Sequence, residues 1–198
     1  TMDNLTITGN QCGSQGGGIY ATSNSHFSLT GGIIQNNTAN DGAGINFDSS
    51  SPTFTDLLVS DNIAVNIGGG IYGHSTNGVI TPSFTNVQII DNESGGSGGG
   101  LYIYNAHATM DNLTITGNQC GSQGGGVYLN QSNINVINSI FWSNSPHEVY
   151  MNGNYNTFLI SHTVLEGAYS GIINFESNQI HWLENNLDED PIFMFPDT

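Results

Sequence analysis

The chain has 198 residues, of which only 8% are charged, against about 25% in an average soluble domain, so its polarity comes from Asn, Ser, Thr and Gly. Because it contains no Lys or Arg, its 16 acidic residues give a net charge of −16. This charge excludes a basic groove for phosphates, so we expect no nucleic acid partner, and no apolar stretch is long enough for a membrane span.

The chain opens with the segment TMDNLTITGNQCGSQGGG, and the same residues return at positions 109–126. A catalytic motif rarely needs two copies, whereas an element that buries itself by stacking on its neighbours needs many. The repetition therefore predicts a stacked repeat architecture in which this segment belongs to one layer.

Two shorter features divide the intervening chain into similar units. Glycine triplets start at Gly16, Gly42, Gly68, Gly98 and Gly124, with Ala43 in the middle of the second. Asparagines recur at intervals of 26, 26, 30, 26 and 26 residues: Asn10, Asn36, Asn62, Asn92, Asn118 and Asn144. The four extra residues of the third interval fall within 73–82, whose composition predicts a surface loop.

Within each unit the apolar residues alternate with a period of two, which indicates strands and not helices. One apolar column precedes the asparagines (Ile7, Ile33, Val59, Ile89, Ile115 and Phe141), and another follows the glycines (Ile19, Ile45, Ile71, Leu101 and Val127). Three short strands per unit of about 26 residues predict an all-β solenoid, a parallel β-helix whose equivalent residues stack about 4.8 Å apart.

The stacking assigns a role to the polar columns as well. We expect the asparagines to form an amide ladder at one turn, where each side chain bonds to the next and to turn backbone. The first and third glycines of each triplet are expected to need a positive φ or to lack room for a Cβ.

The regular pattern covers residues 1–152, and residues 153–198 are expected to form irregular last coils and a C-terminal cap. Trp182, Phe193 and Phe195 are candidates to cover the last layer, because a solenoid needs a covered end. Since the pattern begins inside a coil, we expect the first layer to present an open core and unpaired strand edges, which favour pairing with another chain.

The turns ITGN, VSDN, IIDN and FWSN, with glycine triplets followed by an aliphatic residue and tyrosine, resemble the repeats of right-handed parallel β-helix surface proteins of the pectate-lyase-like superfamily. Polymorphic outer-membrane proteins of chlamydiae are among them; these use GG-[A/G]-[I/L/V] and FxxN, and only Phe141–Asn144 matches the second motif strictly. The tail DEDPIF resembles the D-P-x-F segment that often follows such a β-helix. The resemblance implies a right-handed β-helix and an extracellular or cell-surface location.

An enzyme on this fold needs side chains that the chain largely lacks. Pectate lyases, which the chain resembles in architecture, use an Arg or Lys as base, so the composition excludes that mechanism. Glycoside hydrolysis needs two carboxylates across a cleft, for which Asp61 and Asp91 are candidates. The same pair is also consistent with two solvated turn residues or with a calcium site. We expect no catalytic residue, no other metal site and no cofactor beyond this calcium candidate.

Tyrosines follow the aliphatic column with the opposite parity, which places them on the outer surface: Tyr20, Tyr72, Tyr102 and Tyr128, with Asn46 in the second layer. An exposed row of aromatic faces is suited to stacking on sugar rings and predicts a ligand-binding face. The alternative is a tyrosine stack that stabilises the sheet itself, by about 0.2 to 1 kcal/mol per pair.

The sequence therefore favours a non-catalytic, extracellular structural or adhesive β-solenoid that forms part of a longer repeat protein. Its expected partners are other copies of itself or adjacent repeats, through head-to-tail assembly into fibres, and neutral polysaccharides. Two alternatives stay open on the same fold: a carbohydrate-active enzyme of the glycoside hydrolase type, and a passive glycan-binding module.

Overall fold

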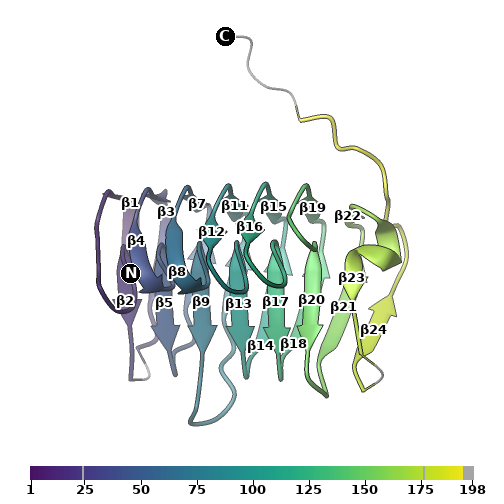
Figure 1. The fold of residues 1–198 in the computed structure, drawn as a ribbon, viewed down its shortest axis with the longest axis horizontal. Helices are drawn as coiled ribbons and strands as arrows, with labels where there is room; N and C mark the ends of the chain where they lie inside the picture. The colour runs from purple at the N-terminus through teal and green to yellow at the C-terminus, as the bar shows by residue number, and fades with distance from the viewer. Residues whose placement is uncertain (24, 176, 194–198) are drawn as a thin grey trace.

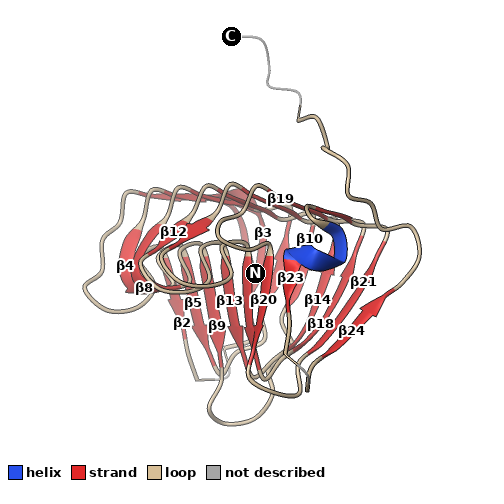
Figure 2. Ribbon diagram, turned by 45° about the vertical axis from the view of Figure 1, so that its right-hand side comes forward, coloured by secondary structure: helices blue, strands red, loops and turns tan. Residues whose placement is uncertain are grey.

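The computed structural model describes residues 1–23, 25–175 and 177–193, and these form a parallel β-solenoid. Its coils follow one another from left to right in Figure 1, so that residues one coil apart lie side by side. Figure 2 shows three sheets of short strands around a common interior. The all-β, parallel architecture that the repeats predict is confirmed.

The three sheets differ in length. The long sheet contains β1 (Met2–Thr8), β3 (Ser28–Gln35), β6 (Thr53–Thr55), β7 (Leu58–Ser60), β10 (Ser83–Thr85), β11 (Gln88–Ile90), β14 (His107–Asp111), β15 (Thr114–Thr116), β18 (Asn133–Ile137), β19 (Ile140–Trp142), β21 (Thr157–Ser161), β22 (Val164–Leu165) and β24 (Gln179–Trp182). The four-stranded sheet contains β4 (Thr38–Asp41), β8 (Ile63–Ile67), β12 (Glu93–Ser94) and β16 (Gln119–Cys120).

The seven-stranded sheet contains one strand from each coil, and we number the coils from 1 to 7 in the order of these strands. They are β2 (Ile19–Ala21), β5 (Ile45–Asp48), β9 (Ile71–His74), β13 (Leu101–Tyr104), β17 (Val127–Asn130), β20 (Val149–Asn152) and β23 (Ile172–Ile173). Within the described residues, the 3-10 turn η1 (Ala168–Gly171) is the one helical element, and no helix is long and apolar enough to cross a membrane.

The strand register places like residues on top of one another. In the seven-stranded sheet, Leu101 pairs with Ile71 on one side and with Val127 on the other. The four extra residues of the third interval lie in the connection between β9 and β10, as predicted. Period-two alternation thus identified the core-facing positions of most coils, because one face of each strand is buried.

The prediction for coil 2 was wrong by one residue. Ile34, not Ile33, pairs with Val59 and is buried, whereas Ile33 is 37% exposed. The ladder residue and the glycine triplet are one residue closer together in this coil than in its neighbours, and the pairing of β4 with β8 contains an irregularity between Ala39 and Asp41. A slip of one residue moves each side chain to the opposite face of its strand.

The interior is a continuous apolar core of stacked columns. Phe54 and Phe84, one coil apart, have ring centroids 5.1 Å from each other, and Phe27 packs edge-on against Phe54 at 5.9 Å. In coil 1 the corresponding core residues Leu5 and Ile19 are only half-buried, as expected for an outer layer. Aliphatic and aromatic burial of this extent is the main stabilising contribution to such a rod.

The solenoid continues beyond residue 152. The strands β21 and β24 extend the long sheet in register, and Trp182 packs against the core and edge-on against Tyr169. Coil 6, however, has no strand in the four-stranded sheet, because the chain passes from β19 to β20 by a shorter route.

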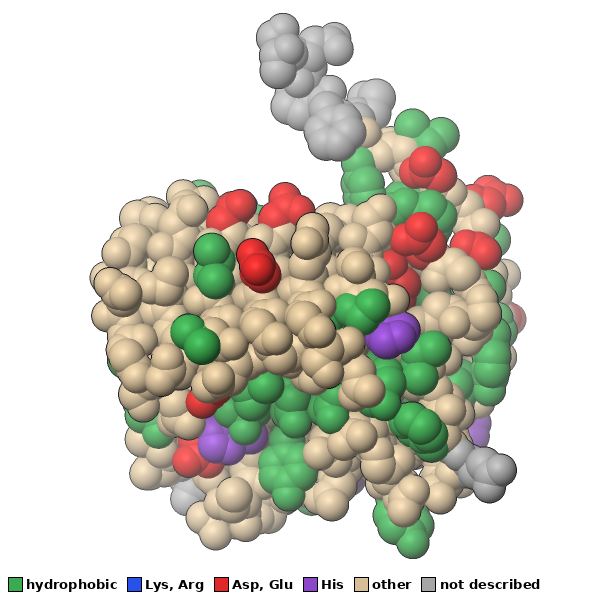
Figure 3. Space-filling view, in the orientation of Figure 1, with side chains coloured by type: hydrophobic (Ala, Val, Ile, Leu, Met, Phe, Trp, Pro, Cys, Tyr) green, Lys and Arg blue, Asp and Glu red, His purple; other side chains and the backbone are tan. Residues whose placement is uncertain are grey.

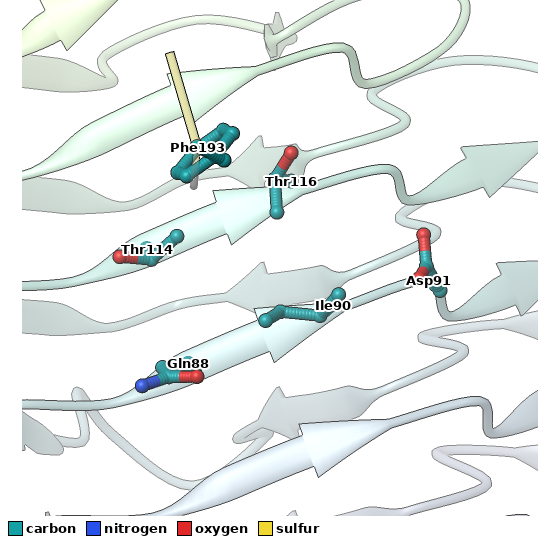
Figure 4. Close-up of a pocket in the computed structure, with 6 residues that line it drawn as sticks. All are labelled: Gln88, Ile90, Asp91, Thr114, Thr116 and Phe193. Atoms are coloured by element: carbon teal, nitrogen blue, oxygen red, sulfur yellow. The ribbon is translucent and has the colours of Figure 1, made fainter. Parts of the chain in front are cut away.

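Phe193 does not cover the last layer, contrary to the prediction. Its ring lies over the outer face of the long sheet, in a hollow of about 390 Å³ that Gln88, Ile90, Thr114 and Thr116 also line (Figure 4). The chain reaches this place because it leaves coil 7 and runs back along the rod (Figure 1). Phe195 lies outside the described residues.

Candidate functional site

The asparagine ladder occupies the interior of the turn between the long sheet and the four-stranded sheet. In each step, Oδ1 of one asparagine accepts hydrogen bonds from the backbone N–H and the Nδ2 of the asparagine one coil earlier. Asn62 donates in this way to Asn92 over N···O distances of 3.1 and 2.9 Å. The members are Asn10, Asn37, Asn62, Asn92, Asn118 and Asn144.

The ladder confirms the prediction at five positions and corrects it at Asn36. Asn37 is fully buried and donates to Asn62, whereas Asn36 is exposed and holds a left-handed backbone conformation with φ 56°. The two roles attract the same residue type, because asparagine both tolerates positive φ and can supply a buried amide. The one-residue slip of coil 2 therefore shifted the ladder by one position.

The glycine triplets serve the ladder and the bend beside it. Each first glycine has a positive φ, which side chains other than Asn and Gly rarely adopt: Gly16, Gly42, Gly68, Gly98 and Gly124. A Cβ on the third glycine would collide with the ladder, as at Gly100, where it would lie 2.9 Å from Cγ of Asn118 and 2.8 Å from the oxygen of Gly126. The first glycine thus meets both predicted reasons, since a Cβ on Gly68 would also lie 2.6 Å from the Cβ of Tyr72, and the third meets the steric one.

The ladder ends at Glu148, a residue that the repeat pattern did not predict. Its carboxylate accepts the hydrogen bonds that an asparagine of the next coil would accept: Asn144 donates from its backbone N at 2.9 Å and from Nδ2 at 2.5 Å. Gly126 pairs with the His147–Glu148 segment, so Glu148 stands where the third glycine of a triplet stands in earlier coils. The signal was the replacement of the triplet by the residues SPHEVY in an otherwise continuous pattern.

The tyrosine column forms a row of rings on the outer surface of the seven-stranded sheet. It consists of Tyr72, Tyr102, Tyr128 and Tyr150, and hydrophobic side chains gather over these strands in Figure 3. The rings of Tyr102 and Tyr128 stack with centroids 4.5 Å apart, and those of Tyr128 and Tyr150 stack at 5.5 Å. Only 6% of the surface of Tyr128 and of Tyr150 is exposed.

The burial of the tyrosines changes what this face offers to a ligand. Burial and, to a smaller extent, the neighbouring Tyr102 raise the pKa of the Tyr72 hydroxyl well above its usual value, so this hydroxyl keeps its proton. Because the rings of the inner coils cover one another's faces, a ligand would meet their edges and hydroxyl groups. Tyr20, the remaining predicted member, is 49% exposed and is separated from the stack by Asn46.

Polar side chains accompany the start of the column. Asn46 is fully buried, and neither atom of its amide has a hydrogen-bond partner. One coil further on, His74 stacks on Tyr72 with centroids 4.4 Å apart, and its Nδ1 lies 3.7 Å from Asp48. Burial lowers the pKa of His74 despite the nearby carboxylates, so this histidine is neutral at pH 7. His74 and Asp48 thus place polar groups beside the ring of Tyr72.

The calcium candidates Asp61 and Asp91 lie side by side in the same turn of neighbouring coils, with φ of 54° and 53°. Burial, and then the charge of Asp61, raises the pKa of the Asp91 carboxyl. Among the residues that the structure describes, no three His, Cys, Asp or Glu side chains gather into a group that could hold a metal ion. Calcium binding by this pair stays a prediction.

Comparison with protein-family models finds the Chlamydia polymorphic membrane protein repeat at residues 4–22 and 112–130. Each match includes a ladder asparagine, a glycine triplet and the tyrosine that follows it, so the matched unit is the part of a coil described above. Together with the parallel solenoid, the two matches confirm the resemblance to β-helix repeat surface proteins. Curated proteins and solved structures give no significant match.

Proposed function

We propose that this chain is a non-catalytic structural segment of a surface repeat protein, a stiff rod that sets a distance or presents the parts joined to it. The observation that supports this role is the buried ladder, which runs without a break from Asn10 to Asn144. From Asn37 onward every step satisfies a buried backbone N–H and two amide groups, so bending one coil away from the next would expose several hydrogen-bonding groups at once.

The test of this proposal is the length of the rod. Residues 19–126 comprise four coils, and a second copy inserted after residue 126 should lengthen the particle by roughly 19 Å, at about 4.8 Å per coil. Small-angle scattering measures this increase. A two-coil insertion of residues 19–70 after residue 70 should add half as much. An unchanged maximum dimension in both variants would exclude a rod that grows by stacking.

The adhesive part of the proposal concerns the first layer, where other copies or adjacent repeats are the proposed partners. Leu5, Ile7 and Ile19 are half-buried there, and β1 has a neighbouring strand on one side. Chains that stack on this layer would extend the columns and build a fibre. Sedimentation at increasing concentration tests the idea: Leu5→Asn should abolish association, and a wild type that stays monomeric up to about millimolar concentration would contradict it.

A second candidate function is the binding of neutral polysaccharide by the tyrosine face. The exposed ring of Tyr20 and the polar groups beside Tyr72 support it, while the mutual stacking of the inner rings supports a structural role. Affinity electrophoresis of Tyr72→Ser/Tyr102→Ser on neutral glycans measures binding. The matched Tyr72→Phe/Tyr102→Phe variant keeps the ring stack. If neither variant changes glycan retention, this face does not bind glycans.

A further inference from the structure

Glu148 ends the asparagine ladder with a group that can lose a proton. Its side chain is 4% exposed, and its two oxygens accept the backbone N–H and the amide of Asn144. An asparagine in this place would accept both bonds on one neutral oxygen, as Asn144 does from Asn118 at 3.0 and 2.9 Å. The last step of the ladder therefore depends on ionisation, which the earlier steps do not.

A second carboxyl group lies against the first. Glu166, from the segment between β22 and η1, interacts with Glu148 and accepts a hydrogen bond from the backbone N of Ser143 at 2.6 Å. The two glutamates and His147 line one cleft of about 270 Å³. Asp188 sits behind it, where it accepts the N–H of Gly167 at 2.8 Å. This cleft joins coil 6 to coil 7.

No positive charge compensates these acids. The chain has no Lys or Arg, and burial lowers the pKa of His147, so this histidine is neutral at pH 7. Burial, opposed by the bonds from Asn144 and assisted by Glu166, raises the pKa of Glu148 to about 7. Two adjacent carboxylates, one of them buried, are costly when both are ionised, so Glu148 keeps its proton to a higher pH than an isolated glutamate does.

We propose that Glu148 is a proton-dependent closure of the rod: with its proton, it completes the ladder and holds coil 7 on coil 6, and without it the two carboxylates repel and the last coils open. In the closed form, the Glu148 hydroxyl donates to Glu166 while its oxygens still accept from Asn144. In the open form, water enters the cleft and solvates both charges. The regular coils, whose ladder is neutral, do not respond.

The direction of the pH effect follows from proton linkage. Because the pKa of Glu148 is raised from 4.5 to about 7 in the folded chain, the closed form binds a proton that the open form releases. The stability of this contact is therefore complete below about pH 4.5 and is lost as the pH rises towards 7. The opening equilibrium should increase about tenfold per pH unit in this window and level off above it.

Hydrogen exchange of the intact chain between pH 5 and 8, corrected for the intrinsic rates, measures this opening. Wild-type peptides from β20 to β23 should lose protection over the window, while peptides from β9 to β17 should not. Glu148→Gln should remove the pH dependence, because its amide oxygen can accept both bonds from Asn144 as a neutral ladder member. Glu166→Gln should shift the midpoint to lower pH, and the exposed Glu93→Gln should leave it unchanged.

Two outcomes would overturn the proposal. One is a wild-type exchange profile for the last coils that is independent of pH. The other is the same pH dependence in Glu148→Gln as in wild type, which would assign the effect to His147 or another group. If Glu148→Gln fails to fold, Glu166→Gln alone decides, because a side chain that only fills space would not shift the midpoint when its neighbour loses a charge.

Discussion

The coils before Asn144 and the coils after it satisfy the same backbone groups with different side chains. In the earlier coils the buried amides lie at the turn into the four-stranded sheet, while at the other two turns, in the step just before Asn144, hydroxyls are the acceptors: Ala106 N–H donates to Ser132 and Leu113 N–H to Ser139. In the later coils the amides move to those two turns, where Asn156, Asn178 and Asn186 accept the corresponding bonds.

The same turn can therefore be served by more than one residue type, since a hydroxyl in one coil and an amide in the next take the same acceptor role. In these pairs a buried N–H at the turn finds its acceptor on a side chain one coil further on. Where the four-stranded sheet stops, its turn becomes tighter and a carboxylate, Glu148, takes the last acceptor position.

The largest expected effect comes from a substitution in the regular coils, at the third glycine of a triplet. Gly100→Ala would place a Cβ 2.8 Å from the oxygen of Gly126 and 2.9 Å from Asn118, so that backbone or ladder must move. We expect a loss of about 4 kcal/mol in the free energy of unfolding, measured with urea, because overpacking and two ladder steps contribute.

Two controls locate this effect. Gly13→Ala should be nearly neutral, since a Cβ there meets nothing within 4 Å. Glu148→Ala changes the equivalent position of coil 6. It removes the acceptor of Asn144, but water in the adjoining cleft can replace that acceptor, so the unfolding free energy should fall by only about 1 to 2 kcal/mol. Equal losses for the coil 4 and coil 6 variants would contradict the contrast drawn between the two regions.

The next effect sharpens the definition of the ladder. Asn92→Ala removes the acceptor of Asn62 and the donor to the oxygen of Val59, both inside the rod. Leaving such groups unpaired should cost about 3 kcal/mol in unfolding free energy. Asn36→Gly should cost less than about 0.5 kcal/mol, because glycine suits its positive φ and Asn36 lies outside the ladder. A larger loss at Asn36 than at Asn92 would mean that Asn36, and not Asn37, is the ladder residue of coil 2.

The architecture was predictable because it depends on the period of the apolar residues and on the spacing of the repeats. Alternation identifies buried faces, and equal intervals identify coils, so the parallel solenoid and the loop before β10 followed from the sequence. The ladder register in coil 2 did not, because Asn36 and Asn37 are adjacent and both of their positions suit asparagine. Intervals of 27 and 25 residues fit the structure, but the triplets alone favour 26 and 26.

Side-chain burial on the outer surface was harder to predict than the fold. Parity places Tyr128 outside the core, and it is outside, yet the ring is almost covered by its neighbours in the column. Likewise, nothing in a single acidic residue among SPHEVY distinguishes an exposed glutamate from one that ends a ladder. Both depend on what the next coil places alongside, which strand periodicity does not describe.

The smallest expected effect compares the two ends of the tyrosine face. Tyr128→Ala removes a ring that is 6% exposed and stacked on both sides, and should lower the unfolding free energy by about 2 kcal/mol. The loss stays below that of a core aromatic residue because the ring lies on the outer side of the sheet, where water can fill the space that it leaves. Tyr20→Ala should cost less than about 1 kcal/mol, since its ring is 49% exposed and stacks on no other tyrosine among the described residues. Equal losses of unfolding free energy in the two variants would mean that ring stacking does not stabilise the sheet. That result would favour a ligand-binding role for the tyrosines.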